Sequence, residues 1–221
     1  MAILTRFLTI VLTLISVGCA SNYVTQEQYS GYLTDYSKLE KIDTASGGVT
    51  LRWISEKLSA KAYHSIILDK TTLYPEPKPT KQVSEMLLKQ FSWSIDKALN
   101  SAAQGTFNVV DQPGEGVLHI KPAVTGVAHS MEGMKVIEIL PVAMVLGIGK
   151  MAIGTRDQDV EVFLEVAVTD SQTGELLAAV VRKGEGAQLE NDEEQLSMVH
   201  LEEMVRNWKK DAAVIFARLA R

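Results

Sequence analysis

The residues with the clearest catalytic chemistry form the run Ala128-His129-Ser130-Met131-Glu132. A hydrolase nucleophile elbow needs small residues two positions before and two positions after its serine, so that a sharp strand-to-helix turn can form. Ala128 nearly meets this requirement, whereas Glu132 does not. A triad would also need an acid and a later histidine, and only His200 follows. A loop serine is therefore the favoured interpretation, and a hydrolase using Ser130 is the alternative.

Histidines and carboxylates are the candidates for a metal site. The histidines are scattered, and their spacing does not place two of them on one face of a helix or strand: His64, His119, His129 and His200. Asp157, Asp159 and Glu161 alternate along the chain and could hold Ca²⁺ loosely from one face of a strand. They lack the glycine turn and ligand spacing of an EF-hand loop, so a solvated strand face is favoured. We expect neither a metal nor another cofactor.

The single cysteine of the chain, Cys19, follows a segment typical of a secretory signal peptide. Arg6 precedes an uncharged apolar run, Phe7 to Val17, which is shorter than the roughly 20 apolar residues that span a bilayer comfortably. The run Ser16-Val17-Gly18-Cys19 resembles a bacterial lipobox, in which the cysteine becomes the lipidated N-terminus. Ordinary signal-peptidase cleavage after Ala20 is the competing interpretation, and it would discard Cys19.

The lipobox resemblance implies a location as well as an anchor. It implies a diacylglycerol on the thiol of Cys19 and an acyl chain on its new amino group, and two or more chains anchor a protein stably. Retention in the inner membrane usually goes with Asp after the cysteine, and Ala20 is there instead. The resemblance therefore implies the outer membrane, facing the periplasm. We expect residues 1–18 to be the signal peptide, 19–44 the lipidated N-terminus and tether, and 45–221 a single α+β periplasmic domain.

Composition limits the partners of the mature chain. The full sequence carries a formal net charge of -5 and has no basic patch or stripe of basic and aromatic residues. Nucleic acid is an improbable partner, because neutralising phosphates supplies most of the affinity in such complexes. No other cysteine accompanies Cys19, so an internal disulfide is excluded and packing alone must stabilise the domain.

Hydrophobic periodicity predicts two amphipathic helices and several strands. Apolar residues recur at helical spacing from Val83 to Ala103 and again in the C-terminal segment, at Leu201, Val205, Trp208, Ala212, Ile215 and Leu219. Strands are predicted at Ser65 to Leu68 and at Val117 to Val127, where Pro122 indicates an edge or a bulge. A hairpin is predicted where alternating residues from Val160 to Val168 are followed by a turn and the run Leu176 to Arg182. We expect an α+β fold with a mainly antiparallel sheet and both helices on one face.

Five short runs resemble a family of small proteobacterial lipoproteins classified as a domain of unknown function. They are Gly31-Tyr32-Leu33, Arg52-Trp53-Ile54, Leu73-Tyr74-Pro75, the run from Gly154 to Val160, and the run from Thr173 to Ala179. The resemblance extends from about Gly31 to the C-terminal helix around Trp208. It implies no known activity, cofactor or catalytic residue.

The most apolar stretch of the mature chain runs from Val136 to Ile153. A buried connector on the sheet is the favoured interpretation. An exposed patch for a partner or for self-association comes next, and a membrane-inserting hairpin comes last because lipid requires every backbone polar group to be paired. If the stretch is exposed, its candidate contact residues are Ile139, Val142, Met144, Val145, Leu146, Ile148, Met151 and Ile153.

These observations favour an accessory or structural lipoprotein that acts by binding. We expect a membrane contact through the lipid anchor, and an envelope protein or a second copy of the chain as partner. We expect no enzymatic activity. A hydrolase using Ser130, or a subunit of an oligomeric envelope secretion assembly, is the alternative.

Replacing the cysteine tests the anchor. We expect the native protein from membranes to have a mass that starts at Cys19 with added acyl chains, and to fractionate with the outer membrane. Cys19→Ala should lose both properties, because the thiol is the attachment point. Intact-mass measurement and fractionation of both proteins check this, and a wild-type mass that starts at Ser21 without lipid would contradict it.

Overall fold

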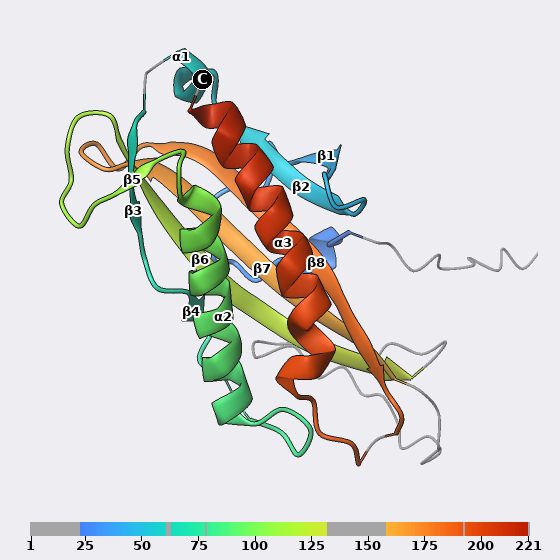
Figure 1. Ribbon diagram of the computed structural model, residues 1–221. Coiled ribbons are helices and arrows are strands. Elements are labelled where there is room, and N and C mark those ends of the chain that lie inside the picture. Colours follow the sequence, from blue (N-terminus) through green and yellow to red (C-terminus); the bar gives the residue numbers. More distant parts are fainter. Residues whose placement is uncertain (1–22, 61–62, 78, 132–157, 192, 221) are drawn as a thin grey trace, which may run out of the picture.

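The computed structural model describes residues 23–60, 63–77, 79–131, 158–191 and 193–220. Among these residues, eight strands form one sheet with the path β1-β2-β8-β7-β6-β3-β5, and β4 pairs with β6 outside this path. Two long helices, α2 and α3, pack side by side on one face of the sheet (Figure 1). The predicted α+β class, with a mainly antiparallel sheet and two main helices packed on it, is confirmed.

The elements follow one another along the chain as strands, one long helix, three long strands and a final helix. Their bounds are η1 (Gln26–Gln28), β1 (Glu40–Asp43), β2 (Val49–Ile54), α1 (Glu56–Ala60), β3 (Ser65–Leu68), β4 (Thr72–Leu73), α2 (Glu85–Ala103), β5 (Asn108–Val109), β6 (Val117–Met131), β7 (Gln158–Asp170), β8 (Leu176–Leu189) and α3 (Met198–Leu219). None of the helices in the described ranges has the length and hydropathy needed to cross a bilayer.

The centre of the sheet is the antiparallel trio β6, β7 and β8. The predicted hairpin is confirmed as β7 and β8, which pair along most of their length. The turn between them is closed by Asp170, whose carboxylate accepts backbone hydrogen bonds from Gln172 and Thr173 at 3.0 Å each. Gly174 completes the turn at a φ of 73°, a conformation that favours glycine.

Both predicted helices are present, and local signals set the ends of the first. Helix α2 begins after Ser84, whose hydroxyl accepts a hydrogen bond from the backbone N–H of Leu87 at 3.1 Å, as an N-cap residue does. It ends at Ala103, shortly before Gly105 turns the chain with a φ of 78°. Its buried residues, including Leu88 and Phe91, face the sheet.

Helix α3 packs closely on β8 because that strand has a glycine beneath it. A Cβ atom on Gly184 would lie 2.5 Å from Cζ2 of Trp208 and would also overlap the side chain of Met204. Trp208 and Met204 are both buried in the helix-face core. Glycine at this position therefore sets how near the helix can come to the sheet.

The proline predicted at an edge or bulge lies opposite the interruption between β3 and β4, the two short strands that pair with β6. The carbonyls of Ile120 and Val124 accept backbone hydrogen bonds from Asp69 and Tyr74, which belong to the chain around β3 and β4. Pro122 lies between these two carbonyls on β6, beside the residues that separate β3 from β4. Its missing N–H group therefore breaks no ladder on that side. A register shift also occurs nearby, between Val124 and Gly126.

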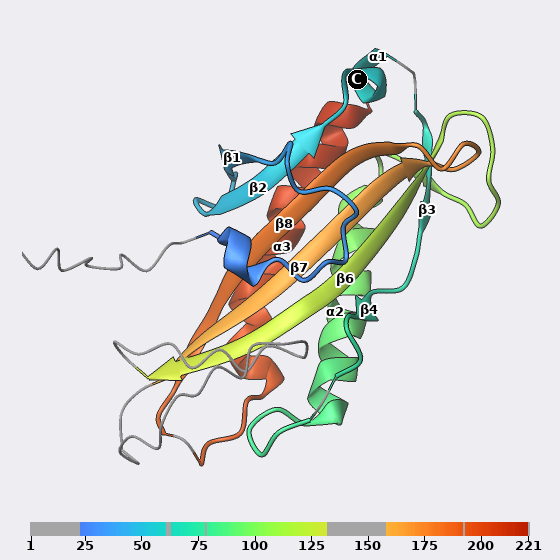
Figure 2. The same ribbon diagram turned by 180° about the vertical axis from the view of Figure 1, so that it is seen from behind.

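The opposite face of the sheet is covered by the amino-terminal chain rather than by helices (Figure 2). Val24 and Leu33 are buried there in a cluster with Leu51, Phe163 and residues of β8, and several tyrosines pack against it. The sequence prediction assigned residues 19–44 to the lipidated N-terminus and tether, whereas the structure packs the chain on the sheet from about residue 23. The tyrosine-rich composition of this segment hides its apolar contacts from a hydropathy pattern.

The amino-terminal segment is held by a buried carboxylate on the central strand. Glu165 of β7 is 1% exposed. It accepts a hydrogen bond from the Tyr36 hydroxyl at 2.6 Å and another from the backbone N–H of Ser30 at 3.2 Å. Burial, and then the hydrogen bond to Glu165, raises the pKa of Tyr36 to about 12. The phenol therefore stays protonated and can donate at neutral pH.

Tyr36→Phe should lower the free energy of unfolding by about 1–3 kcal/mol at pH 7, because Glu165 loses a donor while it stays buried. The pKa of Tyr36 is higher in the folded state than the ordinary value of 10. The difference from wild type is thus full below pH 10 and shrinks as the pH rises towards about 12, where the phenol ionises. Urea unfolding across this pH range measures it. The exposed Tyr74→Phe is the control, and equal effects of the two variants would contradict the prediction.

Candidate functional site

A cavity of about 300 Å³ lies on the helix face, between α3, α2 and the sheet. Its floor comes from β6, β7, β8 and β2, and its roof from α2 and α3. Most of the lining is apolar, and its sheet residues include Leu118, Leu164, Val166, Val168 and Val180. Its volume is at the lower end of the roughly 300–1,000 Å³ typical of ligand pockets.

The cavity exists because the core of this face is divided into two clusters. Trp208 contacts Phe91 in one cluster, with ring centroids 6.3 Å apart, and Phe216 contacts Phe107 in the other at 5.9 Å. These aromatic pairs join α3 to α2 and to the chain that follows α2. Val166 packs against both clusters and is only half-buried although it lies on the central strand. The side chains of the sheet between these two aromatic contacts leave a space unfilled.

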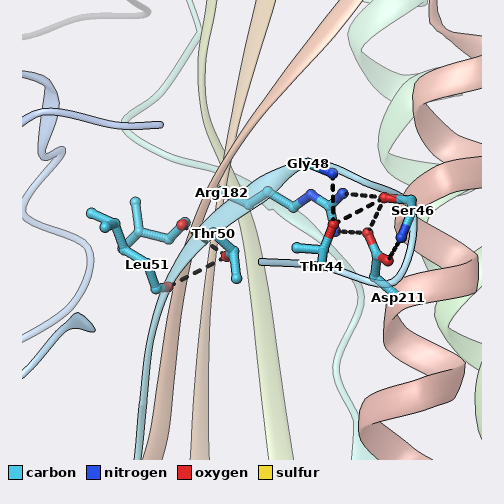
Figure 3. A network of polar contacts seen from close by, with 8 residues as sticks. Thr44, Ser46, Gly48, Thr50, Leu51, Arg182 and Asp211 are labelled. Carbon is cyan, nitrogen blue, oxygen red and sulfur yellow. Dashed lines mark hydrogen bonds and ion pairs between the residues drawn. The ribbon is translucent and has the colours of Figure 1, made fainter. Parts of the chain in front are cut away.

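One wall of the cavity is a buried polar network that joins three elements (Figure 3). The guanidinium of Arg182 on β8 pairs with the carboxylate of Asp211 on α3. Ser46, in the turn between β1 and β2, donates to the same carboxylate from its backbone N–H at 2.7 Å and from its hydroxyl at 2.6 Å. Arg182 also donates to the Ser46 hydroxyl at 3.2 Å. The network fixes the β1–β2 turn against the last helix.

The charges of this network are mutually compensating. Arg182 and Asp211 are 9% and 4% exposed. Burial lowers the pKa of Arg182, and the carboxylate of Asp211 opposes that shift. The guanidinium also lies over the ring of Trp208, 5.6 Å from its centroid, which adds a cation–π contact. These contacts make the pair a structural clamp.

Two further arginines line the cavity and lack such a partner. Arg52 on β2 is half-buried and Arg218, in the last turn of α3, is exposed. Burial, and then the positive charge of Arg218, lowers the pKa of Arg52. Within the described part of the chain, neither guanidinium has an ion pair with a carboxylate. Exposed Lys209 and Asp43 complete the charged lining.

The lipidation site and the candidate contact residues lie outside the described residues. Cys19 precedes residue 23, and all eight contact candidates fall within residues 132–157: Ile139, Val142, Met144, Val145, Leu146, Ile148, Met151 and Ile153. What the structure places is the chain on either side of that segment. Met131 at the end of β6 pairs in register with Gln158 at the start of β7.

The candidate nucleophile lies in a strand rather than in a loop. Ser130 pairs in register with Asp159 within the antiparallel ladder of β6 and β7. The predicted loop placement is wrong, because β6 continues past Val127 to Met131. An elbow would need the serine at a strand-to-helix turn. The later histidine, His200, uses its ring in the N-cap of α3 with Ser197 and lies 3.3 Å from a carboxylate oxygen of Glu194.

The carboxylates proposed to share a solvated strand face have different environments. Asp159 is exposed and accepts a hydrogen bond from Gln188 at 2.7 Å, and Asp157 lies outside the described residues. The solvated interpretation is wrong for Glu161, which is 6% exposed and pairs with Nζ of Lys183 at 2.6 Å. In the described ranges, no three His, Cys, Asp or Glu side chains come together in a way that could hold a metal ion.

Sequence reasoning missed the cavity and its polar wall, although one signal was present. Asp211 occurs between Trp208 and Ala212 on the apolar stripe of the C-terminal helix. A charged residue on a stripe that faces a core must be paired there, so its position predicts a buried cation on the sheet. The partner, Arg182, lies at the end of the predicted hairpin strand. Nothing in the sequence indicates which cation of β8 is the partner.

Comparison with known proteins gives a family and a homologue. A family model described as "Protein of unknown function (DUF3313)" matches residues 28–212. The chain is 32% identical over 197 residues to the "Uncharacterized lipoprotein YdcL" of Escherichia coli K12, and the match covers 89% of each chain. The counterpart in E. coli O157:H7 matches equally well. All five sequence runs that indicated a lipoprotein family lie within the matched residues, and that resemblance is confirmed.

Solved structures with a related arrangement are more distant. A Helicobacter pylori homologue of a neuraminyllactose-binding hemagglutinin is 13% identical with a TM-score of 0.41, covering 72% of this chain and 83% of that one. The PelC dodecamer from Paraburkholderia phytofirmans is 7% identical with a TM-score of 0.35, covering 77% of this chain and 96% of that one. At these TM-scores, the likeness carries no argument about function or assembly.

Asp211→Ala should lower the free energy of unfolding by about 3–5 kcal/mol, because it leaves the guanidinium of Arg182 buried without its carboxylate. The double variant Arg182→Met/Asp211→Leu should recover most of this loss, since it removes both charges and keeps apolar volume. Urea unfolding followed by tryptophan fluorescence measures both. Exposed Glu202→Ala on the same helix is the control. A loss below about 1 kcal/mol for Asp211→Ala, as at exposed ion pairs, would contradict the buried clamp.

Proposed function

This chain belongs to the DUF3313 family of proteins of unknown function, and we propose that it is an accessory lipoprotein of the outer membrane that acts by binding an envelope protein. Its homologue is a lipoprotein, which supports Cys19 as the site of lipid attachment. The proposed membrane follows from Ala20, because the lipobox resemblance associates inner-membrane retention with Asp at that position. The domain would then face the periplasm and act without catalysis.

The observation that carries the binding proposal is the long hairpin of β6 and β7. Their ladder continues to the pair Met131 and Gln158, whereas β3 and β4 pair with β6 only as far as Val124. On the other side, β2 pairs with β8 only as far as Arg182. Strands β6, β7 and β8 therefore extend beyond the ends of β2, β3 and β4, the described strands that flank them. At this end of the sheet, residues 132–157 join β6 to β7.

The length and composition of that connection support a role in contacts. Hairpin connections usually have two to five residues, and connections longer than about 12–15 residues are commonly either functional or linker segments. The hairpin of β7 and β8 follows this rule, because its turn needs only residues 171–175. The connection between β6 and β7 is much longer, at residues 132–157, and it contains all eight apolar contact candidates. Its methionines, including Met144 and Met151, suit an adaptable protein interface.

The buried titratable side chains support binding over catalysis, because each pair fixes one part of the fold to another. Asp211 and Arg182 join α3 to β8, and Lys183 and Glu161 join β8 to β7. Glu165 holds the amino-terminal segment. These groups carry out structural tasks at neutral pH.

Site-specific photocrosslinking in growing cells tests this proposal. A photoreactive amino acid placed at Val145 or at Ile148 should give the same discrete adduct, containing one envelope protein identified by its peptides. The same probe at Val109, which is 50% exposed on β5, is the matched control. Met144→Asp should abolish the adduct from Ile148 while fractionation of the protein stays unchanged, because a charge in the apolar stretch opposes contact.

Each other outcome overturns the proposed partner. An adduct with the mass of two copies would assign the stretch to self-association. No adduct from either position, or an equal adduct from Val109, would remove it as a contact surface. Loss of hydrolytic activity in Ser130→Ala, with the adduct intact, would favour the hydrolase alternative.

A further inference from the structure

The cavity under α3 is open to solvent between that helix and β2. Ile54 on β2, Val180 on β8, and Ile215 and Leu219 on α3 all line it and are only half-buried. Deeper lining residues, such as Ile120, are buried in the core. An apolar lining thus continues from the core to the surface. Such a cavity disfavours water, because it offers few polar groups for water to bond.

The charged side chains that line the cavity are mostly basic. Arg52 and Arg218 have no carboxylate partner in the described part of the chain, and Lys209 adds a third cation. Asp43 is the one lining carboxylate outside the clamp, since Asp211 is already paired with Arg182. Burial, and then repulsion by the positive charge of Arg218, lowers the pKa of Arg52. An anion between them would relieve this repulsion and form charge-assisted hydrogen bonds.

We propose that this cavity binds a single-chain anionic amphiphile, with its hydrocarbon chain between α3 and the sheet and its head at Arg52 and Arg218. The chain would replace the missing contacts between the two core clusters, beside Val166 and Val180. The head can be a carboxylate or a phosphate, because guanidinium groups bind both. This site does not rest on the proposed protein partner, since the described residues that line the cavity come from α2, α3, the sheet and the β1–β2 turn.

The described N-terminal segment, residues 23–39, does not occupy the cavity under α3 (Figure 2). Residues 23–39 cross the opposite face of the sheet, where Glu165 holds Tyr36 and Ser30 (Figure 2). A chain bound under α3 would therefore be separated from that segment by the thickness of the sheet. Attachment at the N-terminus and occupation of the cavity can occur together.

Photoaffinity labelling of the full mature protein in phosphatidylcholine vesicles tests the proposal. The probe is a fatty acid with a diazirine in the middle of its chain, and labelled positions are mapped by peptide mass spectrometry. We expect labels on the β8 peptide that contains Val180 and on the α3 peptide that contains Ile215. Laurate and dodecyl phosphate should compete, and their relative strength distinguishes a carboxylate head from a phosphate head. Neutral dodecyl maltoside should compete about tenfold less well.

Substitutions separate the head contact from the chain contact. Arg52→Gln/Arg218→Gln should weaken labelling about tenfold or more without unfolding the protein, since both side chains reach solvent. Val180→Phe should block labelling by filling the cavity. Arg206→Gln, an exposed arginine of α3 that does not line the cavity, is the matched control and should label as wild type does.

Three results would overturn the proposal. Labels outside the cavity would show that the probe sits elsewhere. Equal labelling of the double arginine variant and Arg206→Gln would remove the head contact, and equal competition by dodecyl maltoside would do the same. The crosslinking result at Val145 is read separately, so failure of one proposal leaves the other standing.

Discussion

Burial of the central strand β7 on both faces is the constraint on which the rest of the structure depends. Its side chains towards the helices are apolar, whereas Glu161 and Glu165 point to the opposite face and are almost fully buried. A buried carboxylate is tolerated only with donors around it, because its lost hydration costs several kcal/mol. Lys183 of β8 supplies one partner, and Tyr36 of the amino-terminal segment supplies another. The segment before β1 is therefore part of the domain, since without it Glu165 would lose its donors.

On the helix face of the sheet, a charged pair is buried at the edge of the helix layer, and a cavity lies in the middle of that layer. The pair Arg182 and Asp211 fixes α3 beside the β1–β2 turn, and aromatic contacts from Trp208 and Phe216 support the helix at two heights. Between them the cavity is lined by sheet side chains such as Val166, which is only half-buried although it packs against both clusters. An apolar cavity of this kind weakens a core, because its lining atoms lack protein contact partners. Its presence beside free arginines is the physical reason to expect an occupant.

The elements predicted best from the sequence are those whose own pattern is strong. Alternation from Val160 to Val168 and helical spacing from Val83 to Ala103 identified the hairpin and α2, because each buries one regular face. The amino-terminal layer was missed because its contacts come from tyrosines and from isolated residues such as Val24, which form no period. Burial of Glu161 was missed for a related reason: a carboxylate at an alternating position normally indicates solvent, and its partner lies on another strand. The parallel pairing of β3 with β6 likewise depends on contacts far apart in sequence.

Three features of the fold lie on different surfaces, and their separation follows from the same central strand. The amino-terminal segment covers one face of β7, the cavity opens on the other, and the β6–β7 ladder ends beyond both at Met131 and Gln158 (Figures 1 and 2). Strand β8 links them, because adjacent residues point to opposite faces: Arg182 reaches the clamp with α3, and Lys183 reaches Glu161. A shift of β8 would disturb both ion pairs at once, and each is buried and costly to break. The sheet therefore separates the proposed sites of attachment, ligand binding and protein contact from one another.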